Sequence, residues 1–390
     1  MRFLVLILCV LFLGFSSTAL AVTWLVPSQC PTIQAGIDTA SAGDTVLVAC
    51  GIYTWANQGT GTSSGLVRMK SGICLRSETG QPECVVIDAQ GGPRVLSCNS
   101  ASSATSIEGF TITGARGTAG IHGAGIRCDY SDLTIRDCII EDNIAGGSGG
   151  GILLGNFSDA TLLDCVINNN EAGKNGGGLQ CIVSDPIITG CTFSNNRGFT
   201  SANISGSGGG ANFEDSDSEI SDCVFYGNTI IGSGGGLSCG GYSAGLVLVN
   251  STVYGNSSTK LVGGVACSVP SRPVRVENVI IASSGAGVGL YVYPNPDVSI
   301  ACCNVWGNAG GDWVGNVADF LGVNGNFSDC PAFCDTALAD FNLCNESPCL
   351  PGNHPYGYDC GLIGAFGQGC ICGPSATRAS TWGGIKSIYR

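Results

Sequence analysis

The chain has 390 residues and a formal net charge of −13, with only 16 lysines and arginines. This acidity excludes nucleic-acid binding, which needs a basic surface, and it weighs against polyanionic glycans as ligands. The mean hydropathy of +0.29 reflects apolar and glycine-rich segments that are each too short to span a bilayer.

The N-terminus has the pattern of a secretory signal. Met1-Arg2 precedes an apolar run over residues 3–15, and Ala19-x-Ala21 follows it. We therefore expect residues 1–21 to be removed and the mature chain to have no transmembrane segment. Loss of Cys9 leaves an even number of cysteines, as expected in an oxidising compartment. The protein is predicted to be secreted or associated with a bacterial cell surface or outer membrane.

The middle of the chain repeats about every 27 residues. Triplets of glycine end at Gly151, Gly178, Gly210 and Gly236, at intervals of 27, 32 and 26 residues. A row of asparagines repeats with the same long step, and Asn308 follows two repeats later. Its members are Asn143, Asn170, Asn196, Asn228 and Asn256. Two markers with one period indicate stacked structural units.

Each repeat is too short for a βαβ unit and contains short segments that alternate apolar and polar residues, such as 133–138 and 246–251. Short strands joined by Gly and Asn turns predict an all-β fold, a right-handed parallel β-helix over residues 22–325. The 32-residue step predicts an outward loop at residues 198–207. We interpret the asparagines as a structural ladder, since Asn tolerates the left-handed conformation and bonds to its neighbour above.

The cysteines follow the same period and are predicted to point inward. One coil position holds Cys138, Cys165, Cys191, Cys223, Ser251 and Cys303, and another holds Cys128, Cys181, Cys239 and Cys267. Four pairs stand ten residues apart, which suggests some disulfides between coils without fixing their connectivity. These pairs are Cys74/Cys84, Cys128/Cys138, Cys181/Cys191 and Cys360/Cys370.

Residues 31–53, which include Pro31-Thr-Ile33-Gln and Gly43-Asp-Thr-Val46, resemble the opening of right-handed parallel β-helix repeat proteins of the pectin-lyase-like superfamily. The resemblance implies a short capping helix, which would begin near Pro31 and bury Ile33, Ile37 and Ala40, followed by the first full strand from Gly43-Asp-Thr-Val46. Cys30 and Cys50 flank this unit, and we expect them to form a disulfide.

The Gly/Asn repeats resemble those of polymorphic outer-membrane proteins, and residues 330–349 resemble the closing segment of exported bacterial β-helices. The resemblance implies a Cys-rich cap at 326–372. Residues 373–390 differ in composition and are interpreted either as a sorting signal or as a weakly docked end.

Catalytic motifs of the superfamily are hard to find in this sequence. There is no Asp-Asp pair, and the only histidines are His122 and His354, both interpreted as structural. A lyase would need a base beside carboxylates that hold Ca²⁺. Asp137 and Asp164 precede ladder cysteines on adjacent coils, and Asp215 and Asp217 lie in an acidic run at 214–219. These four are weak Ca²⁺ candidates, and a solvated acidic surface is the favoured interpretation.

Aromatic residues give the remaining binding signal. Tyr291, Tyr293, Trp306 and Trp313 gather near the last coils, where they would either stack on sugars or form a capping core. The favoured function is a non-catalytic, exported β-helix that binds an extracellular glycan or a surface receptor. The alternatives are a polysaccharide lyase or glycoside hydrolase and a structural cell-surface component.

Overall fold

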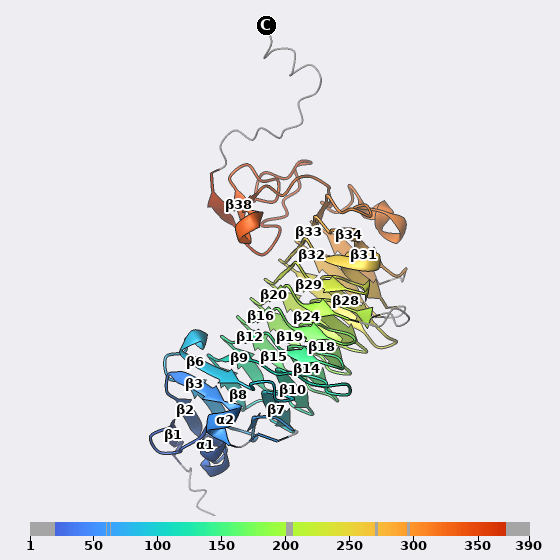
Figure 1. Cartoon of the computed structure of the whole chain (residues 1–390). Helices are drawn as coiled ribbons and strands as arrows, with labels where there is room; N and C mark the ends of the chain where they lie inside the picture. The colour runs from blue at the N-terminus through green and yellow to red at the C-terminus, as the bar shows by residue number, and fades with distance from the viewer. Residues whose placement is uncertain are drawn as a thin grey trace, which may run out of the picture.

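The chain winds into a long solenoid in which each coil stacks on the one before it (Figure 1). The computed structural model describes residues 20–59, 61–62, 64–199, 206–269, 272–294 and 297–371. The expected signal peptide and tail therefore lie outside the described residues, as does most of the predicted outward loop. The N-terminal helix closes one end, and the closing segment lies at the other. No helix in the described part of the chain is long and apolar enough to cross a membrane.

Three parallel sheets form the walls of the solenoid, and successive coils add strands to each sheet in turn. The first sheet has eleven strands: β1 (Thr23–Val26), β2 (Thr45–Val48), β5 (Cys74–Ser77), β8 (Ser106–Glu108), β11 (Thr134–Arg136), β15 (Thr161–Leu163), β19 (Ile187–Thr189), β24 (Asp217–Ser221), β29 (Gly245–Val249), β32 (Val274–Glu277) and β35 (Val298–Ala301). The second sheet has ten: β3 (Gly51–Thr54), β6 (Val85–Asp88), β9 (Thr111–Thr113), β12 (Ile139–Glu141), β16 (Val166–Asn168), β20 (Thr192–Ser194), β25 (Val224–Tyr226), β30 (Thr252–Tyr254), β33 (Ile280–Ala282) and β36 (Asn304–Trp306).

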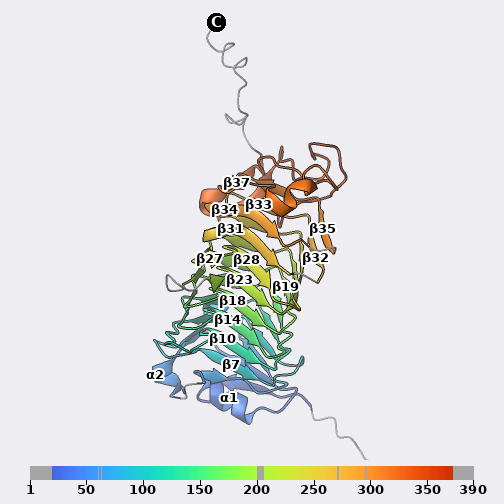
Figure 2. The ribbon, with the colours of Figure 1, turned by 90° about the vertical axis from the view of Figure 1, so that its right-hand side faces the viewer.

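The third sheet has thirteen strands in two rows that meet in β31 (Ser257–Ser268), which also pairs with β34 (Ala286–Val292). The longer row faces the viewer in Figure 2. It contains β4 (Val67–Arg68), β7 (Leu96–Asn99), β10 (Ile126–Asp129), β14 (Ile152–Gly155), β18 (Leu179–Ile182), β23 (Ala211–Glu214) and β28 (Leu237–Gly240). The shorter row contains β13 (Ile144–Ala145), β17 (Glu171–Ala172), β21 (Arg197–Gly198) and β26 (Thr229–Ile230). A separate ribbon pairs β22 (Gly206–Ser207) with β27 (Gly232–Ser233).

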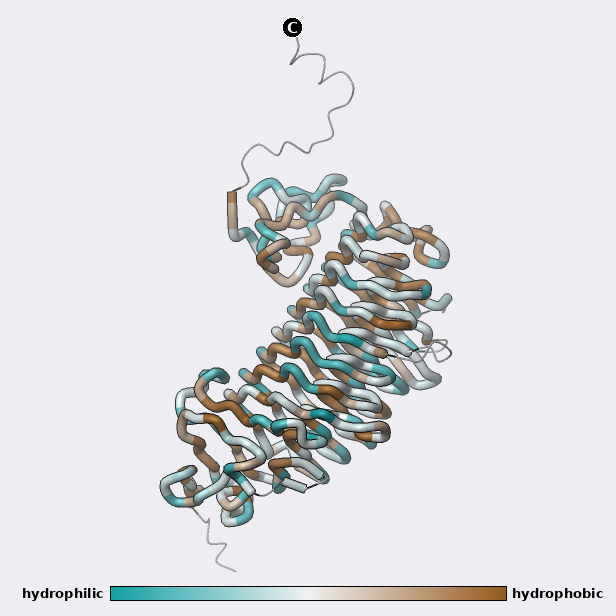
Figure 3. Tube along the Cα trace, in the orientation of Figure 1, coloured by the Kyte–Doolittle hydropathy of each residue, from teal (hydrophilic) through white to brown (hydrophobic). Residues whose placement is uncertain are grey.

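Alternation within the strands directs apolar side chains into the solenoid, and brown and teal segments accordingly alternate along the tube of Figure 3. The buried core runs through the whole stack, with Phe193 and Phe225 of adjacent coils stacked at 4.7 Å. The asparagine ladder is confirmed, since Asn143, Asn170 and Asn196 are all buried and bond to one another in sequence. The predicted β-helix is therefore correct in fold and in register.

The N-terminal cap is helix α1 (Ile33–Thr39), and Ile33, Ile37 and Ala40 are fully buried as expected. Its N-cap is Thr32, whose hydroxyl accepts the N–H of Ala35 at 3.0 Å, so Pro31 lies one residue before the cap. Strand β1 precedes the helix and pairs with β2, so the sheet begins earlier than Gly43-Asp-Thr-Val46 indicated. The first coils also contain a short helix, α2 (Trp55–Gln58), and a 3-10 helix, Pro82–Cys84.

The expected disulfide between Cys30 and Cys50 is wrong. Cys50 bonds to Cys84, which joins two coils, whereas Cys30 is a buried free thiol. This pairing also rules out Cys74/Cys84. Cys128, Cys138, Cys181 and Cys191 are buried free thiols as well, because a spacing of ten residues carries the chain to a different sheet.

The closing segment packs on the second sheet, and the disulfides Cys302–Cys360 and Cys334–Cys370 join described residues there. These bonds contradict Cys360/Cys370 and confirm the Cys-rich cap. Its small sheet consists of β37 (Phe333–Asp335), β38 (Asp340–Cys344) and β39 (Gln368–Cys370), with the 3-10 helix Thr336–Leu338 between the first two strands. Another 3-10 helix, Gly315–Phe320, precedes this segment. Phe333 and Phe341 contact Tyr254 of the last coils.

Candidate functional site

The outer face of the longer row of the third sheet carries polar side chains from several successive coils. In each four-residue strand of the longer row, the first and third residues point into the core, so the second and fourth point outward. The fourth positions line up in register from β7 to β31, and Tyr293 directly follows the last paired residue of β34. We call this row the lane. The lane contains Asn99, Asp129, Gly155, Ile182, Glu214, Gly240, Ser268 and Tyr293.

The second positions form a row beside the lane that is largely buried by the glycine-rich turns. Gln180 and Asn212 are both buried, and Asn212 Nδ2 donates to Gln180 Oε1 at 3.1 Å. Gln180 Nε2 donates to the carbonyl of Cys181 at 2.8 Å. These hydrogen bonds fix the orientation of the two amide groups, which lie beside the lane.

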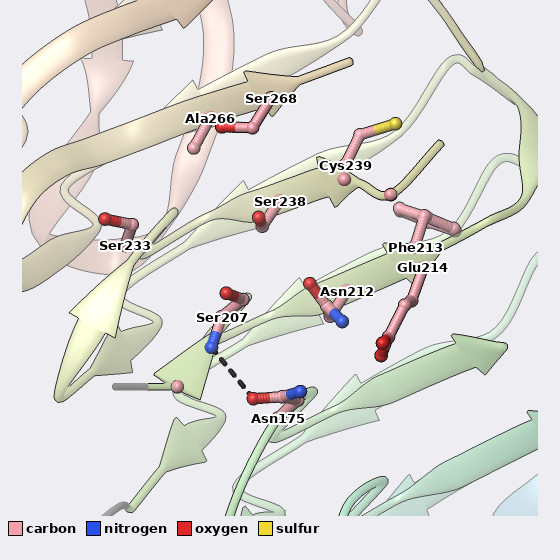
Figure 4. Close-up of a pocket in the computed structure, with 13 residues that line it drawn as sticks. Asn175, Ser207, Asn212, Phe213, Glu214, Ser233, Ser238, Cys239, Ala266 and Ser268 are labelled. Carbon is pink, nitrogen blue, oxygen red and sulfur yellow. Dashed lines mark hydrogen bonds between the residues drawn. The ribbon is translucent and has the colours of Figure 1, made fainter. Parts of the chain in front are cut away.

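A hollow of about 380 Å³ opens over β23, β28 and β31 and is shown in Figure 4. Small polar side chains from the sheet and from the turns that precede it surround the hollow, and the N–H of Ser207 donates to Asn175 Oδ1 at 3.1 Å. Glu214 contributes a carboxylate to the lining of this hollow. The polar lining residues are Asn175, Ser207, Asn212, Glu214, Ser233, Ser238 and Ser268.

A second hollow of about 410 Å³ lies at the other end of the lane, over β7 and β10. Arg127 Nε lies 2.6 Å from Asp129 Oδ2, and Asn156 Nδ2 donates to Asp129 Oδ1 at 2.8 Å. The exposed Tyr130 completes the lining beside Asn99. This hollow therefore combines an aromatic ring, an ion pair and an amide.

Arg94 lies below the second hollow and is held by three backbone carbonyls, those of Ser64, His122 and Gly123. Burial, reinforced by the nearby charge of Arg127, lowers the pKa of Arg94 to about 10. It remains cationic at neutral pH, and its three contacts show that it anchors the turns of the first coils.

The two histidines differ in their surroundings. His122 Nδ1 accepts the N–H of Ser148 at 3.0 Å, which places the proton of the neutral ring on Nε2. Burial, followed by the charges of Arg127, Lys174 and Arg94, lowers the pKa of His122. It is half-buried, less exposed than a free turn residue would be. His354 is buried in the closing segment, with Nε2 2.8 Å from the carbonyl of Gly325, which fits a structural role.

The family described as right handed beta helix region matches residues 50–214 and 124–328, two overlapping stretches that together cover more than half of the chain. The chain belongs to the right-handed β-helix family. No curated protein matches it by sequence.

Two solved structures resemble this β-helix. The structure of pectate lyase Pel9A is 13% identical with a TM-score of 0.50, and the match covers 89% of this chain and 96% of that one. A mannuronic acid-specific family 6 polysaccharide lyase from the human gut microbiota is 16% identical with a TM-score of 0.28, covering 75% and 81%. At this identity the match to the pectate lyase supports the fold alone.

The four aromatic candidates divide between surface and core. Tyr291 pairs in register with Ala266, and Tyr293, which is 46% exposed, ends the lane of the β-helix. Trp313 is only 8% exposed and donates its Nε1–H to the carbonyl of Phe327 at 2.8 Å, so it belongs to the capping core. Trp306 is half-buried on the second sheet beneath the closing segment.

The carboxylates suggested for Ca²⁺ are not gathered into one site. Asp137 and Asp164 are exposed corner residues with φ near +52° and +51°. Asp164 Oδ1 lies over Gly190 of the next coil, so a Cβ at this position would require the carboxylate to move. Asp215 Oδ1 accepts the N–H groups of Tyr242 and Ser243, so it closes a turn.

Asp217, the fourth candidate, forms an ion pair with Arg272. Within the described ranges, no group of three or more His, Cys, Asp or Glu side chains is placed to hold a metal ion. The solvated, structural interpretation therefore fits the observed contacts of Asp215 and Asp217.

Proposed function

We propose that this β-helix is an exported protein that binds an extended polysaccharide along the lane without cleaving it. The observation that carries the proposal is the lane itself, which pairs in register from Asn99 to Ser268, with Tyr293 directly after the last paired residue of β34. Adjacent strands are about 4.8 Å apart, so the lane offers a regular series of contacts to a chain molecule with a short repeat.

The chemistry of the lining suits sugars. Hydroxyl, amide and carboxylate groups exchange hydrogen bonds with sugar hydroxyls, while an exposed ring stacks on the apolar face of a pyranose. Both hollows supply such polar groups, and Tyr130 and Tyr293 supply rings at opposite ends of the lane. The exported location is part of the proposal and is supported by disulfides such as Cys50–Cys84.

Binding without cleavage is favoured because the charged groups at the second hollow are already engaged. A catalytic base needs free access to the proton that it removes. Asp129 accepts from Arg127 and from Asn156, and Arg94 is occupied by backbone carbonyls.

A polysaccharide lyase is the second candidate. The observation that favours it is the cluster of Arg94, Arg127 and His122 beside Asp129, in a fold shared with a pectate lyase. Substrate binding that opened the Arg127–Asp129 pair would free a cation and a carboxylate in the lane.

Affinity gel electrophoresis of residues 22–390 against a polysaccharide panel tests the proposal, with a parallel assay for unsaturated and reducing sugar ends. We expect retardation by at least one polymer without release of new ends. Tyr293→Ala should weaken binding about tenfold, which corresponds to one lost stacking contact. Tyr356→Ala, an exposed tyrosine of the closing segment, is the control. Turnover would establish the lyase or hydrolase instead, and absence of both would refute the proposal.

A further inference from the structure

A rim of exposed apolar side chains borders the lane where the chain leaves the third sheet. After each strand the backbone takes a left-handed turn, with φ of +52° at Tyr130, +61° at Phe157 and +51° at Val183. Tyr130 is 57% exposed and Phe157 is 65% exposed. Tyr242, 86% exposed, follows the corresponding strand two coils after that of Val183. We call Tyr130, Phe157, Val183 and Tyr242 the rim.

These turns are unfavourable places for large side chains. The left-handed region suits Gly, Asn and Asp, and a bulky or β-branched residue there is strained. Other corners of the same solenoid use the favourable residues, for example Asn169, Asn195 and Asn250. Because the side chains of Tyr130 and Phe157 are exposed, packing does not require them. Strain that is retained without a packing benefit points to a binding role.

The rim is continuous with the lane. Tyr130 lines the second hollow beside Asn99 and Asp129. The N–H of Tyr130 donates to the carbonyl of Asn156 on the next coil, and the N–H of Phe157 donates to the carbonyl of Val183 at 2.7 Å. The two rings therefore lie on successive coils, alongside polar groups that bond to sugar hydroxyls.

An acidic row runs beside the rim, two residues further along each coil. Its members are linked from coil to coil, since Asp132 accepts the N–H of Asp159, Asp159 that of Asp185, and Asp185 that of Asp217, at 3.2, 2.8 and 2.7 Å. Asp132, Asp159 and Asp185 are exposed. Stacked carboxylates on a chain of net charge −13 create a negative potential along this edge.

We propose that the rim stacks on the sugar rings of a neutral polysaccharide and that the acidic row excludes polyuronates. This inference rests on the proposed glycan binding and names its substrate class. Tyr130 and Phe157 supply the stacking surfaces, and the polar lane supplies hydrogen bonds. A polyuronate lying on the same surface would bring its carboxylates next to Asp159 and Asp185, and the repulsion would weaken with added salt.

The first experiment compares xyloglucan and galactomannan, which are neutral, with polygalacturonate in affinity gels and titration calorimetry. The double variant Tyr130→Asn/Phe157→Asn removes both rings and installs a residue that the left-handed turn favours. We expect binding of the neutral polymer to weaken at least tenfold while the melting temperature stays equal or rises by about 2 °C. Tyr356→Asn removes an exposed ring of the closing segment, which packs on the second sheet, and should leave binding unchanged.

The second variant, Asp159→Asn/Asp185→Asn, keeps the oxygens that accept the backbone N–H groups but removes two charges. We expect it to increase retention of polygalacturonate several-fold at low salt. Binding of polygalacturonate by the unaltered protein more tightly than neutral polymers, with or without Ca²⁺, would overturn the inference.

The two proposals fail differently. If a neutral polymer binds and Tyr293→Ala weakens it, but the double rim variant does not, then the lane binds glycan and the rim inference is wrong. If the rim variant loses stability and binding together, the rings are structural and the inference is again wrong. If none of the polymers binds, glycan binding itself is refuted and the inference falls with it.

Discussion

Asn143 and Asn170 are joined by two hydrogen bonds across adjacent coils. Asn170 Oδ1 accepts the backbone N–H of Asn143 at 3.1 Å and Nδ2 of Asn143 at 3.2 Å. The same pair of bonds recurs from Asn170 to Asn196 and from there to Asn228. Each amide thus satisfies buried backbone groups at a corner where the chain turns away from the ladder of a sheet.

Truncation of one ladder residue should therefore be costly. Asn196→Ala removes an acceptor from the N–H of Asn170 and a donor to the carbonyl of Ile167 at 2.8 Å, both buried. At about 1–3 kcal/mol for each unsatisfied group, we expect the free energy of unfolding to fall by about 3–5 kcal/mol in guanidinium denaturation. Asn195→Gly, an exposed residue at φ +53°, should change it by less than about 1 kcal/mol. Equal effects of the two variants would argue against the ladder.

The glycine triplets make a second matched comparison possible. A Cβ on Gly178 would lie 2.6 Å from the carbonyl oxygen of Gly210 and 3.0 Å from the amide of Asn196, whereas a Cβ on Gly240 meets nothing within 4 Å. We expect Gly178→Ala to destabilise the protein by about 1–3 kcal/mol through displacement of the adjacent coil. Gly240→Ala should be neutral or slightly stabilising in the same denaturation assay. A neutral Gly178→Ala would show that the coils are more loosely stacked than described.

The repeat-based features were accessible from the sequence because each recurs at one coil position. Asn143 and Gly151 are members of such series, and their period fixed both the solenoid and its register. The alternation around Cys128 and Cys138 also correctly predicted that both thiols point inward.

The disulfide partners could not be predicted from the repeat period, because each disulfide joins two residues that do not recur from coil to coil. Cys50 bonds to Cys84 because the solenoid brings them to a Cα separation of 4.8 Å, a distance that depends on coil geometry. The rim was missed although Tyr130 and Val183 stand two residues after Cys128 and Cys181. Their exposure and positive φ depend on the turn conformation, which neither the repeat period nor the alternation of apolar residues reveals.

The disulfide connectivity can be checked directly. Peptide mapping without reduction should recover Cys50–Cys84, Cys302–Cys360 and Cys334–Cys370. Cys302–Cys360 closes a loop with a sequence separation of 58 and ties the closing segment to the last coils. Its replacement by Ser/Ser should lower the free energy of unfolding by about 4 kcal/mol. Recovery of a Cys30–Cys50 peptide would contradict the structure.

Calcium should have little effect on this protein. Asp215 is occupied by backbone N–H groups and Asp217 by Arg272, so neither offers a free set of oxygen ligands. We expect the melting temperature to be the same in millimolar Ca²⁺ and in chelator, within about 1 °C. The variant Asp137→Asn/Asp164→Asn should respond to Ca²⁺ as the unaltered protein does. A stabilisation by Ca²⁺ that this variant abolishes would restore the corner carboxylates as a cation site.

Alkaline pH should destabilise the folded chain through its buried thiols. Burial raises the pKa of Cys303 and of Cys349 to about 12, from an ordinary value of 9.0. The unfolded chain therefore loses these protons first, so the stabilisation is complete below about pH 9 and is lost as the pH rises toward 12. Each thiol should steepen the decline by about 1.4 kcal/mol per pH unit in that window.

Cys303→Ser isolates this effect. Ser251 shows that the position accepts a hydroxyl, because its Oγ accepts the N–H of Cys223 at 3.1 Å. We expect Cys303→Ser to fold and to lose stability more gradually between pH 9 and 12 than the unaltered protein. Cys330→Ser, which replaces an exposed thiol, should leave the slope unchanged. If the two variants gave the same slope, deprotonation of the buried thiols would not be what limits stability at high pH.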